Sequence, residues 1–335
     1  MKLVDRTVER IDRSQRERPW LSFPLGVAKK FGEDRAGNLA ALIAYYGFFS
    51  MFPLLLVFVS LLGIFLHGNP DLAESIRKSV LSQFPVIGST LKVKALRASG
   101  IGLGVGMATA LWAGLGVTSA AQNAMNDIWG VKMKDRPNFF MRRIRGILVL
   151  LLLGVIVLAS TIASGFSTSS GTLGWVLRVA GILVSLGLNL VLYLLSFRIL
   201  TRKKLSWGDV FPGAAVGAVL WTLLQSFGGY YVGHQVKNAS EVYGTFALVI
   251  GLLVWIYLGA QVTLYCAEIN VVRKYRLWPR SLSVPPFTDG DKRTLEFRAQ
   301  IEERYPQEDV EVEFEPGTQE GRDRPSDRPA KQSAG

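Results

Sequence analysis

Long uncharged stretches alternate along the chain with short charged ones. A spanning helix needs about 20 mostly apolar residues, because the hydrocarbon core of a bilayer is ~30 Å thick. Only helices or a closed barrel can satisfy their backbone there, and barrel strands would be short and alternating. The uncharged stretches occupy residues 36–70, 98–126, 146–177, 179–197, 210–236 and 242–267. The pattern predicts an all-α membrane protein, a bundle of six transmembrane helices. We place the spans at roughly 39–66, 100–122, 146–165, 175–197, 210–232 and 244–267.

Basic residues gather in alternate loops. They are frequent in the arm 1–35 and again after the second, fourth and sixth stretches, whereas the loops between carry few, apart from 67–98. Positive residues beside spans tend to remain cytoplasmic. We therefore expect a multi-pass protein with both termini in the cytoplasm. Whether loop 67–98 enters the membrane stays open.

Composition divides the chain into three parts. Residues 1–35 form a basic arm in which 20–32 is predicted to lie at the membrane interface, and 36–275 form the transmembrane domain. Residues 276–335 read as a cytoplasmic, largely disordered acidic tail, with a short helix near 291–304 as the candidate exception.

The net charge of +12 at pH 7 hides an uneven distribution. Residues 1–280 carry 30 basic and 13 acidic residues, whereas 281–335 carry 8 and 13. Because the basic residues line the ends of spans, anionic lipid headgroups are the expected partners and nucleic acid is not.

The residues that usually carry chemistry are scarce. Cys266 is the one cysteine, which excludes a disulfide framework and CxxC metal sites. His67 and His234 are the two histidines, and no membrane segment holds paired carboxylates. The sequence therefore predicts no catalytic residue, no metal and no cofactor, and we do not expect an enzyme.

Small residues recur at every fourth position in the second stretch. Such a ridge lets helix backbones approach closely. The ridge consists of Gly102, Gly106, Ala110 and Gly114, followed by Thr118, and Gly213 and Gly217 repeat the spacing in the fifth stretch. We predict helix packing at these positions. The ridge could serve within one chain or between copies, so a homo-oligomer stays open.

Polar residues share a face with aromatic ones in the first stretch. Tyr45 lies near the face that also holds Asn38 and Pro53, with Tyr46 beside it and Ser50 further round. Pro53 removes a backbone donor and predicts a kink. These residues either pack between helices or line a cavity, and the sequence does not decide between the two.

The sixth stretch places Tyr257, Gln261 and Glu268 within one narrow sector of a helix. Glu268 has no well-spaced basic partner on its own helix. It is either an interfacial carboxylate paired with a basic residue of another helix or a protonatable group on a solute path.

Several segments together resemble the YihY/BrkB family of bacterial inner-membrane proteins, in order over about 35–275. They are 44–55 (AYYGFFSMFPLL), 124–131 (AMNDIWGV), 136–137 (RP), 205–207 (LSW) with Asp209, 212–213 (PG), Trp221, 243–246 (YGTF), 253–257 (LVWIY) and 267–270 (AEIN). Cys266 departs from the family, which usually has glycine there. The resemblance implies a bacterial inner-membrane location. The ribonuclease label that some relatives carry looks like a misassignment.

The resemblance also indicates where a functional centre would lie. The matching positions are Tyr45, Tyr46, Ser50, Pro53, Asn126, Tyr257, Gln261 and Glu268. A role in moving or flipping a lipid or another envelope-related solute is the leading hypothesis. A non-transporting envelope scaffold, whose tail recruits a partner, is the alternative, and a membrane-associated ribonuclease is the least favoured. The substrate is not readable from the sequence.

Overall fold

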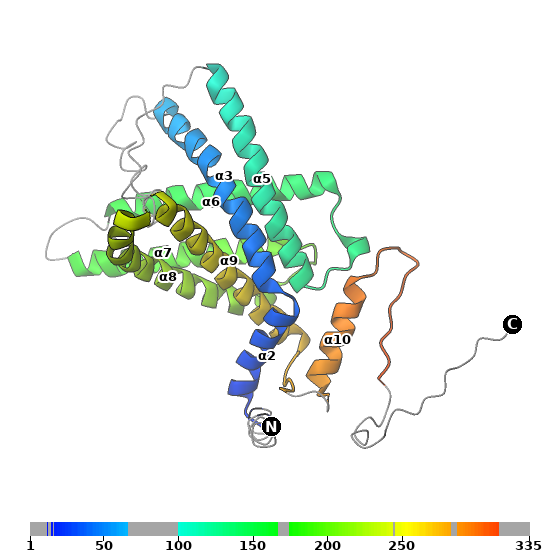
Figure 1. The fold of residues 1–335 in the computed structure, drawn as a ribbon. Coiled ribbons are helices and arrows are strands. Elements are labelled where there is room, and N and C mark those ends of the chain that lie inside the picture. Colours follow the sequence, from blue (N-terminus) through cyan, green and yellow to red (C-terminus); the bar gives the residue numbers. More distant parts are fainter. Residues whose placement is uncertain are drawn as a thin grey trace.

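The structure is a computed structural model that describes Asp12, Gln15 and residues 17–65, 100–166, 174–243, 245–282 and 287–314. This part of the chain contains eight α-helices, one short 3-10 helix and no strand (Figure 1). They are α2 (Pro19–Glu33), α3 (Ala36–Phe65), α5 (Gly100–Ile128), η1 (Met133–Asp135), α6 (Phe139–Phe166), α7 (Gly174–Leu200), α8 (Trp207–Tyr243), α9 (Thr245–Tyr275) and α10 (Asp289–Ile301). The all-helical class predicted from the apolar pattern is confirmed.

The six long helices follow the six predicted spans. Each has 27 to 37 residues and therefore extends beyond the stretch that we assigned to the membrane. Within the described residues, α7, α8 and α9 each contain a segment long and apolar enough to cross a bilayer: Val179–Leu200, Trp207–Gln225 and Val249–Tyr275. The structure thus supports a helical membrane protein, while the count of six spans and the cytoplasmic side of the termini stay predictions.

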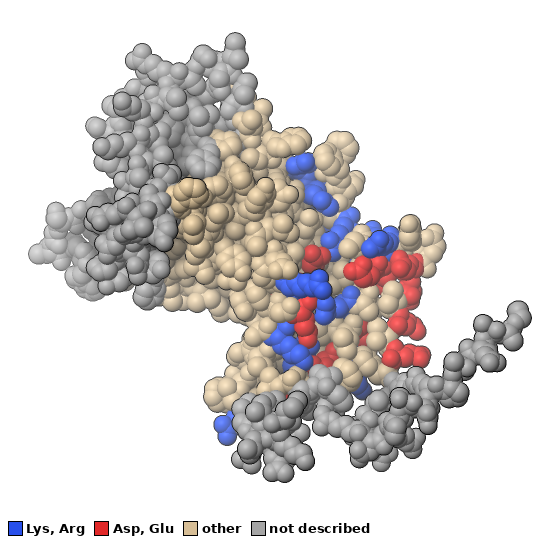
Figure 2. Space-filling model, in the orientation of Figure 1, with Lys and Arg blue, Asp and Glu red and all other residues tan. Residues whose placement is uncertain are grey.

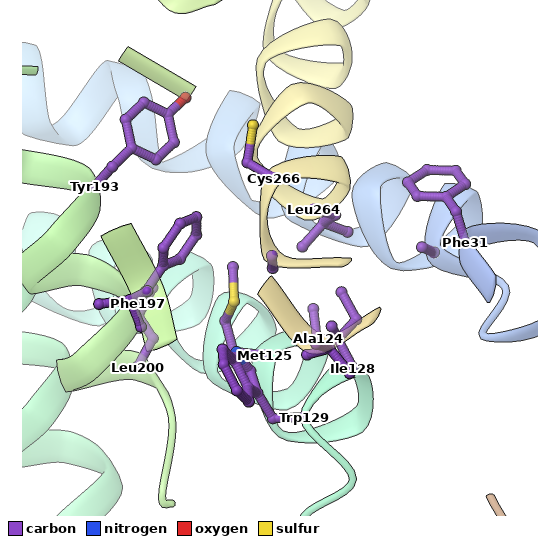
Figure 3. Packing of buried hydrophobic residues seen from close by; sticks show 14 of the residues in the cluster. Phe31, Ala124, Met125, Ile128, Trp129, Tyr193, Phe197, Leu200, Leu264 and Cys266 are labelled. Carbon is purple, nitrogen blue, oxygen red and sulfur yellow. The ribbon is translucent and has the colours of Figure 1, made fainter. Parts of the chain in front are cut away.

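Helix α9 lies between two groups of helices. On one side α3 runs along α5, and on the other α7 runs along α8, at a steep angle to the first pair (Figure 1). Helix α9 packs against both α3 and α8, and its end also contacts α2. The packing core lies at this end of the bundle. There Met125 of α5, Trp129 just after that helix and Phe197 of α7 belong to one buried cluster with Leu264 of α9 (Figure 3).

Two glycines of α8 lie at very close helix contacts. A Cβ at Gly213 would overlap the carbonyl oxygen of Cys266 on α9, and one at Gly217 would lie 3.0 Å from the ring of Tyr193 on α7. In α5, a Cβ at Gly114 would lie 3.0 Å from the side chain of Leu150. Of the remaining ridge positions, Gly102, Gly106 and Ala110 fall outside the described side chains.

The short helix that the sequence placed near 291–304 is present as α10, and residues 276–282 and 287–314 of the predicted tail have a described structure. Helix α10 begins with a capping box between Thr288 and Asp291 and packs on the end of the bundle. Buried ion pairs hold this segment although it contains few apolar residues. Arg280 forms an ion pair with Glu33 of α2 at 2.6 Å, and Lys132 forms one with Glu303 at 2.8 Å. Residues 315–335 lie outside the described part.

Charged side chains gather at one end of the molecule. Figure 2 shows Lys, Arg, Asp and Glu together over the end that carries α2, α10 and the adjoining loops, while the visible face of the long helices carries almost none. Because Lys29 of α2 binds Asp291 of α10, both described ends of the chain lie at this charged end. A chain that crosses the membrane an even number of times has both ends on the same side, which agrees with this arrangement.

Candidate functional site

The predicted polar face of α3 points outward. Tyr45 is 55% exposed and Tyr46 is 43% exposed, and Asn38, Leu42 and Phe49 on the same side are exposed as well. Within the described part of the chain, neither tyrosine hydroxyl has a hydrogen-bond partner. The aromatic rings contact one another, with 5.4 Å between the ring centroids of the two tyrosines.

The opposite face of α3 holds small residues that let the helix approach α9. Ala40 and Ala44 are buried, and a Cβ at Gly47 would lie 3.1 Å from the side chain of Ile256. Ser50 is also buried, and its hydroxyl donates to the carbonyl of Gly47 at 3.0 Å. Ser50 therefore belongs to the packed side of the helix, apart from the two tyrosines.

The polar residues of α9 find partners of their own. The Gln261 amide donates to the Tyr257 hydroxyl at 2.9 Å, and this hydroxyl lies near Gly37 at the start of α3. One turn further, the Tyr265 ring stacks on Phe31 of α2 at 3.7 Å between centroids. The structure thus does not bring Tyr257 and Gln261 together with the exposed face of α3.

Glu268 lies in a buried ionic cluster with Lys30 and Asp34. Its Oε2 is 3.1 Å from the Lys30 ammonium, and both side chains have no exposed surface. Lys30 also pairs with Asp34 and donates to the carbonyl of Ile128 at 3.2 Å. The interfacial ion pair to another helix, one of the two interpretations of Glu268, matches this geometry.

The cluster contains two carboxylates for one ammonium. Burial by itself would lower the pKa of Lys30, but the charges of Glu268 and Asp34 outweigh it and raise that pKa. The Glu268 oxygen Oε1 is buried and has no hydrogen-bond partner among the described residues. Arg298 of α10 reaches Asp34 from the rim of the cluster at 3.9 Å. The cluster thus fastens α2 to α9.

Asn126 has a structural partner at the end of α5. Its side-chain oxygen accepts a hydrogen bond from the Arg202 backbone at 3.0 Å, and the side chain is buried. It therefore connects α5 to the loop between α7 and α8. Pro53 lies inside α3 and is partly buried.

Sequence reasoning missed Lys30, the partner of Glu268. One signal was present, because Lys30 lies among Val27, Phe31 and Gly26 on the buried side of α2. A lysine on the apolar face of an amphipathic helix indicates a buried partner. No local pattern in the sequence identified Glu268 as that partner, because α2 and α9 lie far apart along the chain.

The comparison with known proteins decides the family. The sequence pattern of the family described as virulence factor BrkB matches residues 27–287, from α2 to just before α10. The chain belongs to the BrkB family. Both Lys30 and Glu268 lie within the match, whereas α10 lies beyond it. The predicted family membership is confirmed.

Relatives of this BrkB-family protein are named as membrane proteins. Inner membrane protein YhjD of Escherichia coli strain K12 is 25% identical over 304 residues, which cover 84% of this chain and 88% of that protein. The UPF0761 membrane protein of Vibrio campbellii is 28% identical over 255 residues, covering 72% and 79%. UPF0761 membrane protein Smlt0865 of Stenotrophomonas maltophilia is 27% identical over 278 residues, covering 79% and 64%. No solved structure matches the chain.

Proposed function

We propose that this protein moves a lipid across the bacterial inner membrane, with the exposed face of α3 as the path of the lipid headgroup. The observation that supports the proposal is the exposure of Tyr45 and Tyr46, whose hydroxyls have no hydrogen-bond partner within the described part of the chain. The proposal includes no catalytic step and no cofactor. Both termini lie in the cytoplasm, and the basic loops contact anionic headgroups.

The exposure of the two tyrosines on the outside of α3 favours a lipid over a soluble solute as the transported molecule. A polar group that faces hydrocarbon without a partner is unfavourable by about 1–3 kcal/mol. A soluble solute needs an enclosed polar path, whereas a lipid keeps its tails in the bilayer and slides only its headgroup along the protein. Exposed hydroxyls on a spanning helix suit the second route, because a passing headgroup can accept their hydrogen bonds.

The depth of Tyr45 distinguishes it from an interfacial anchor. Residue 39 is the first of the predicted span, and Tyr45 lies six residues further along α3. At 1.5 Å per residue this is about 9 Å into the hydrocarbon, which is roughly a third of its thickness. Tyrosines that anchor a helix lie at headgroup level instead.

A fluorescent-lipid assay in liposomes tests the proposal. The purified protein is reconstituted with a headgroup-labelled phospholipid, and an impermeant quencher reports how fast inner-leaflet lipid reaches the outer leaflet. We expect faster exchange than in protein-free liposomes, and about a tenfold loss in the double variant Tyr45→Leu, Tyr46→Leu, which corresponds to ~1.4 kcal/mol of barrier. Exchange at the protein-free rate would refute the proposal.

Tyr193→Phe is the matched control. It also removes a phenolic hydroxyl, but this one is buried on α7 and lies 3.4 Å from the hydroxyl of Thr263. We expect the control to retain wild-type exchange. Equal losses in the control and in the double variant would indicate general damage to the bundle and would count against a path along α3.

A scaffold function is the second candidate, and an exposed acidic strip favours it. Asp309, Glu311 and Glu313 follow α10 in the chain, and all three are exposed. Neutralising these three residues leaves α10 and its buried ion pairs in place. A scaffold should then lose its partner, whereas a lipid transporter should keep its exchange rate. Removing all of 281–335 would not discriminate, because it also deprives buried Arg280 of its Asp291 partner.

A further inference from the structure

A pocket of about 960 Å³ opens at the charged end of the molecule. Its walls come from the loop between α5 and α6, the loop between α7 and α8, the end of α9 and one side of α10. The volume is that of a ligand site for a small molecule. Six basic side chains line it: Lys132, Lys134, Arg136, Arg202, Lys203 and Arg293. Asp135 and Glu296 are the two acidic residues of the lining.

Three of the basic side chains already have an ion-pair partner. Lys132 and Lys134 bind the carboxylate of Glu303 at 2.8 and 2.7 Å, and Arg136 pairs with Asp127. Hydrogen bonds from the two lysines lower the pKa of Glu303 to about 2, so this carboxylate stays charged at neutral pH. These residues build the wall of the pocket.

The other three cations have no ion-pair partner among the described residues. Within the described part of the chain, no carboxylate lies at ion-pair distance from Arg202, Lys203 or Arg293. Arg293 uses one guanidinium nitrogen for the carbonyl of Arg276 at 3.2 Å. Lys203 is partly buried, and its ammonium donates to the Tyr275 hydroxyl at 3.2 Å. The pocket therefore has an unbalanced positive charge.

Lys203 is the most constrained of the three. Burial, and next the positive charges of Lys274 and Lys132, lower its pKa to about 8. Its surroundings also include Asp135 of the α5–α6 loop, Lys30 of α2 and the ring of Phe297 on α10 at 5.2 Å. An anion beside Lys203 would relieve the mutual repulsion of these cations.

We propose that this pocket binds a phosphate group, held by Lys203 together with Arg202 and Arg293. A phosphate brings up to two negative charges and several acceptor oxygens, which suits three unneutralised cations better than one carboxylate would. The guanidinium groups offer forked donors and the ammonium a point charge. A soluble phosphomonoester and a phospholipid headgroup share this chemistry. The proposal does not depend on lipid movement along α3.

Calorimetric titration with glycerol phosphate tests the soluble source. The full-length protein is held in phosphatidylcholine nanodiscs, and sodium chloride of equal ionic strength serves as the blank. We expect saturable binding that is at least about tenfold weaker in Lys203→Gln, the usual size of one lost charge-assisted contact. Arg293→Gln should weaken binding in the same direction, which keeps the test valid if one variant folds poorly.

Lys204→Gln is the matched control for Lys203→Gln. Lys204 is the next residue, is exposed and does not line the pocket. It should retain wild-type affinity. No binding above the chloride blank in either kind of nanodisc would overturn the proposal, and so would equal weakening in both lysine variants, because that indicates general surface charge.

Nanodiscs that contain phosphatidylglycerol separate the two phosphate sources. If a phospholipid headgroup occupies the pocket, these nanodiscs should abolish the binding of glycerol phosphate and raise the thermal midpoint of the wild type but not of Lys203→Gln. If the ligand is soluble, glycerol phosphate should bind equally in both kinds of nanodisc. Neither result depends on lipid exchange, so the two proposals can fail separately.

The pH dependence of binding gives a further readout. A phosphomonoester has its second pKa near ~6 and stays doubly charged above neutral pH. Lys203 loses its proton as the pH rises through about 8, so the affinity of the wild type should fall there. Lys203→Arg stays charged and should bind without this decline. A wild-type affinity that is constant from pH 7 to 9 would remove Lys203 from the site.

Discussion

Removing Lys30 should destabilise the protein much more than removing Glu268. Lys30 is the one ammonium between two buried carboxylates, those of Glu268 and Asp34. After Lys30→Met, the two carboxylates face each other without a cation between them. After Glu268→Gln, Lys30 keeps Asp34 and the carbonyl of Ile128 as partners. The asymmetry follows from the positions of the three groups.

The burial of the cluster sets the size of each effect. Leaving a buried charge without its partner typically reduces the free energy of unfolding by about 3–5 kcal/mol. We expect a loss of this size for Lys30→Met. Glu268→Gln removes one interaction of a cation that stays paired, so we expect about 1–2 kcal/mol. Adding Glu268→Gln to Lys30→Met should restore part of the loss, because only one unpaired carboxylate remains.

Denaturant titration of the three variants and the wild type in one detergent provides the measurement. The two single variants and the double variant form a double-mutant cycle, whose coupling energy isolates the contact between Lys30 and Glu268. Similar losses for the two single variants, or a double variant less stable than Lys30→Met, would refute the reasoning. A well-folded Glu268→Gln with normal lipid exchange would also reject Glu268 as a protonatable group on the path.

Two further predictions concern packing and the C-terminal segment. Gly213→Ala should destabilise the protein by about 1–3 kcal/mol in the same titration, because its methyl group would overlap the carbonyl of Cys266. Gly187→Ala, at an exposed position of α7 with nothing within 4 Å, should change stability little, and a comparable loss there would contradict the packing argument. Because the pKa of Glu303 is lowered from its ordinary value of 4.5, the charged carboxylate stabilises the segment after α10 at every pH above 4.5. This stabilisation is lost as the pH falls from 4.5 toward about 2. The protection factors of the amides in 302–314, which correct for the intrinsic pH dependence of exchange, should therefore fall over that interval in the wild type, while Glu303→Gln should show low protection already at neutral pH.

The helices themselves were predictable from the sequence. Long apolar stretches in lipid have few alternatives to helices, because backbone groups there must bond within their own segment. The close packing of Gly213 against α9 also has a local signal, since only small residues allow such an approach. For the tail, the sequence indicated the short helix near 291–304 but not the ion pairs that hold it. Arg280 donates a hydrogen bond of 2.6 Å to Glu33, which lies 247 residues away, and this part-buried ion pair holds the segment to the bundle. The average hydrophobicity of a segment gives no indication of such a pair.

Periodicity determined which side chains share a face of a helix, and only the tertiary structure decided where that face points. The sequence placed Tyr45 and Tyr46 on one part of α3 and Glu268 on one face of α9. In the folded protein the first pair faces outward and Glu268 meets Lys30 of α2 in the interior. Five of the six basic residues of the pocket were visible as loop charges beside the predicted spans, and the sixth, Arg293, lies on α10. Their convergence required three distant chain segments to meet, and contacts between distant segments depend on packing that no local pattern encodes.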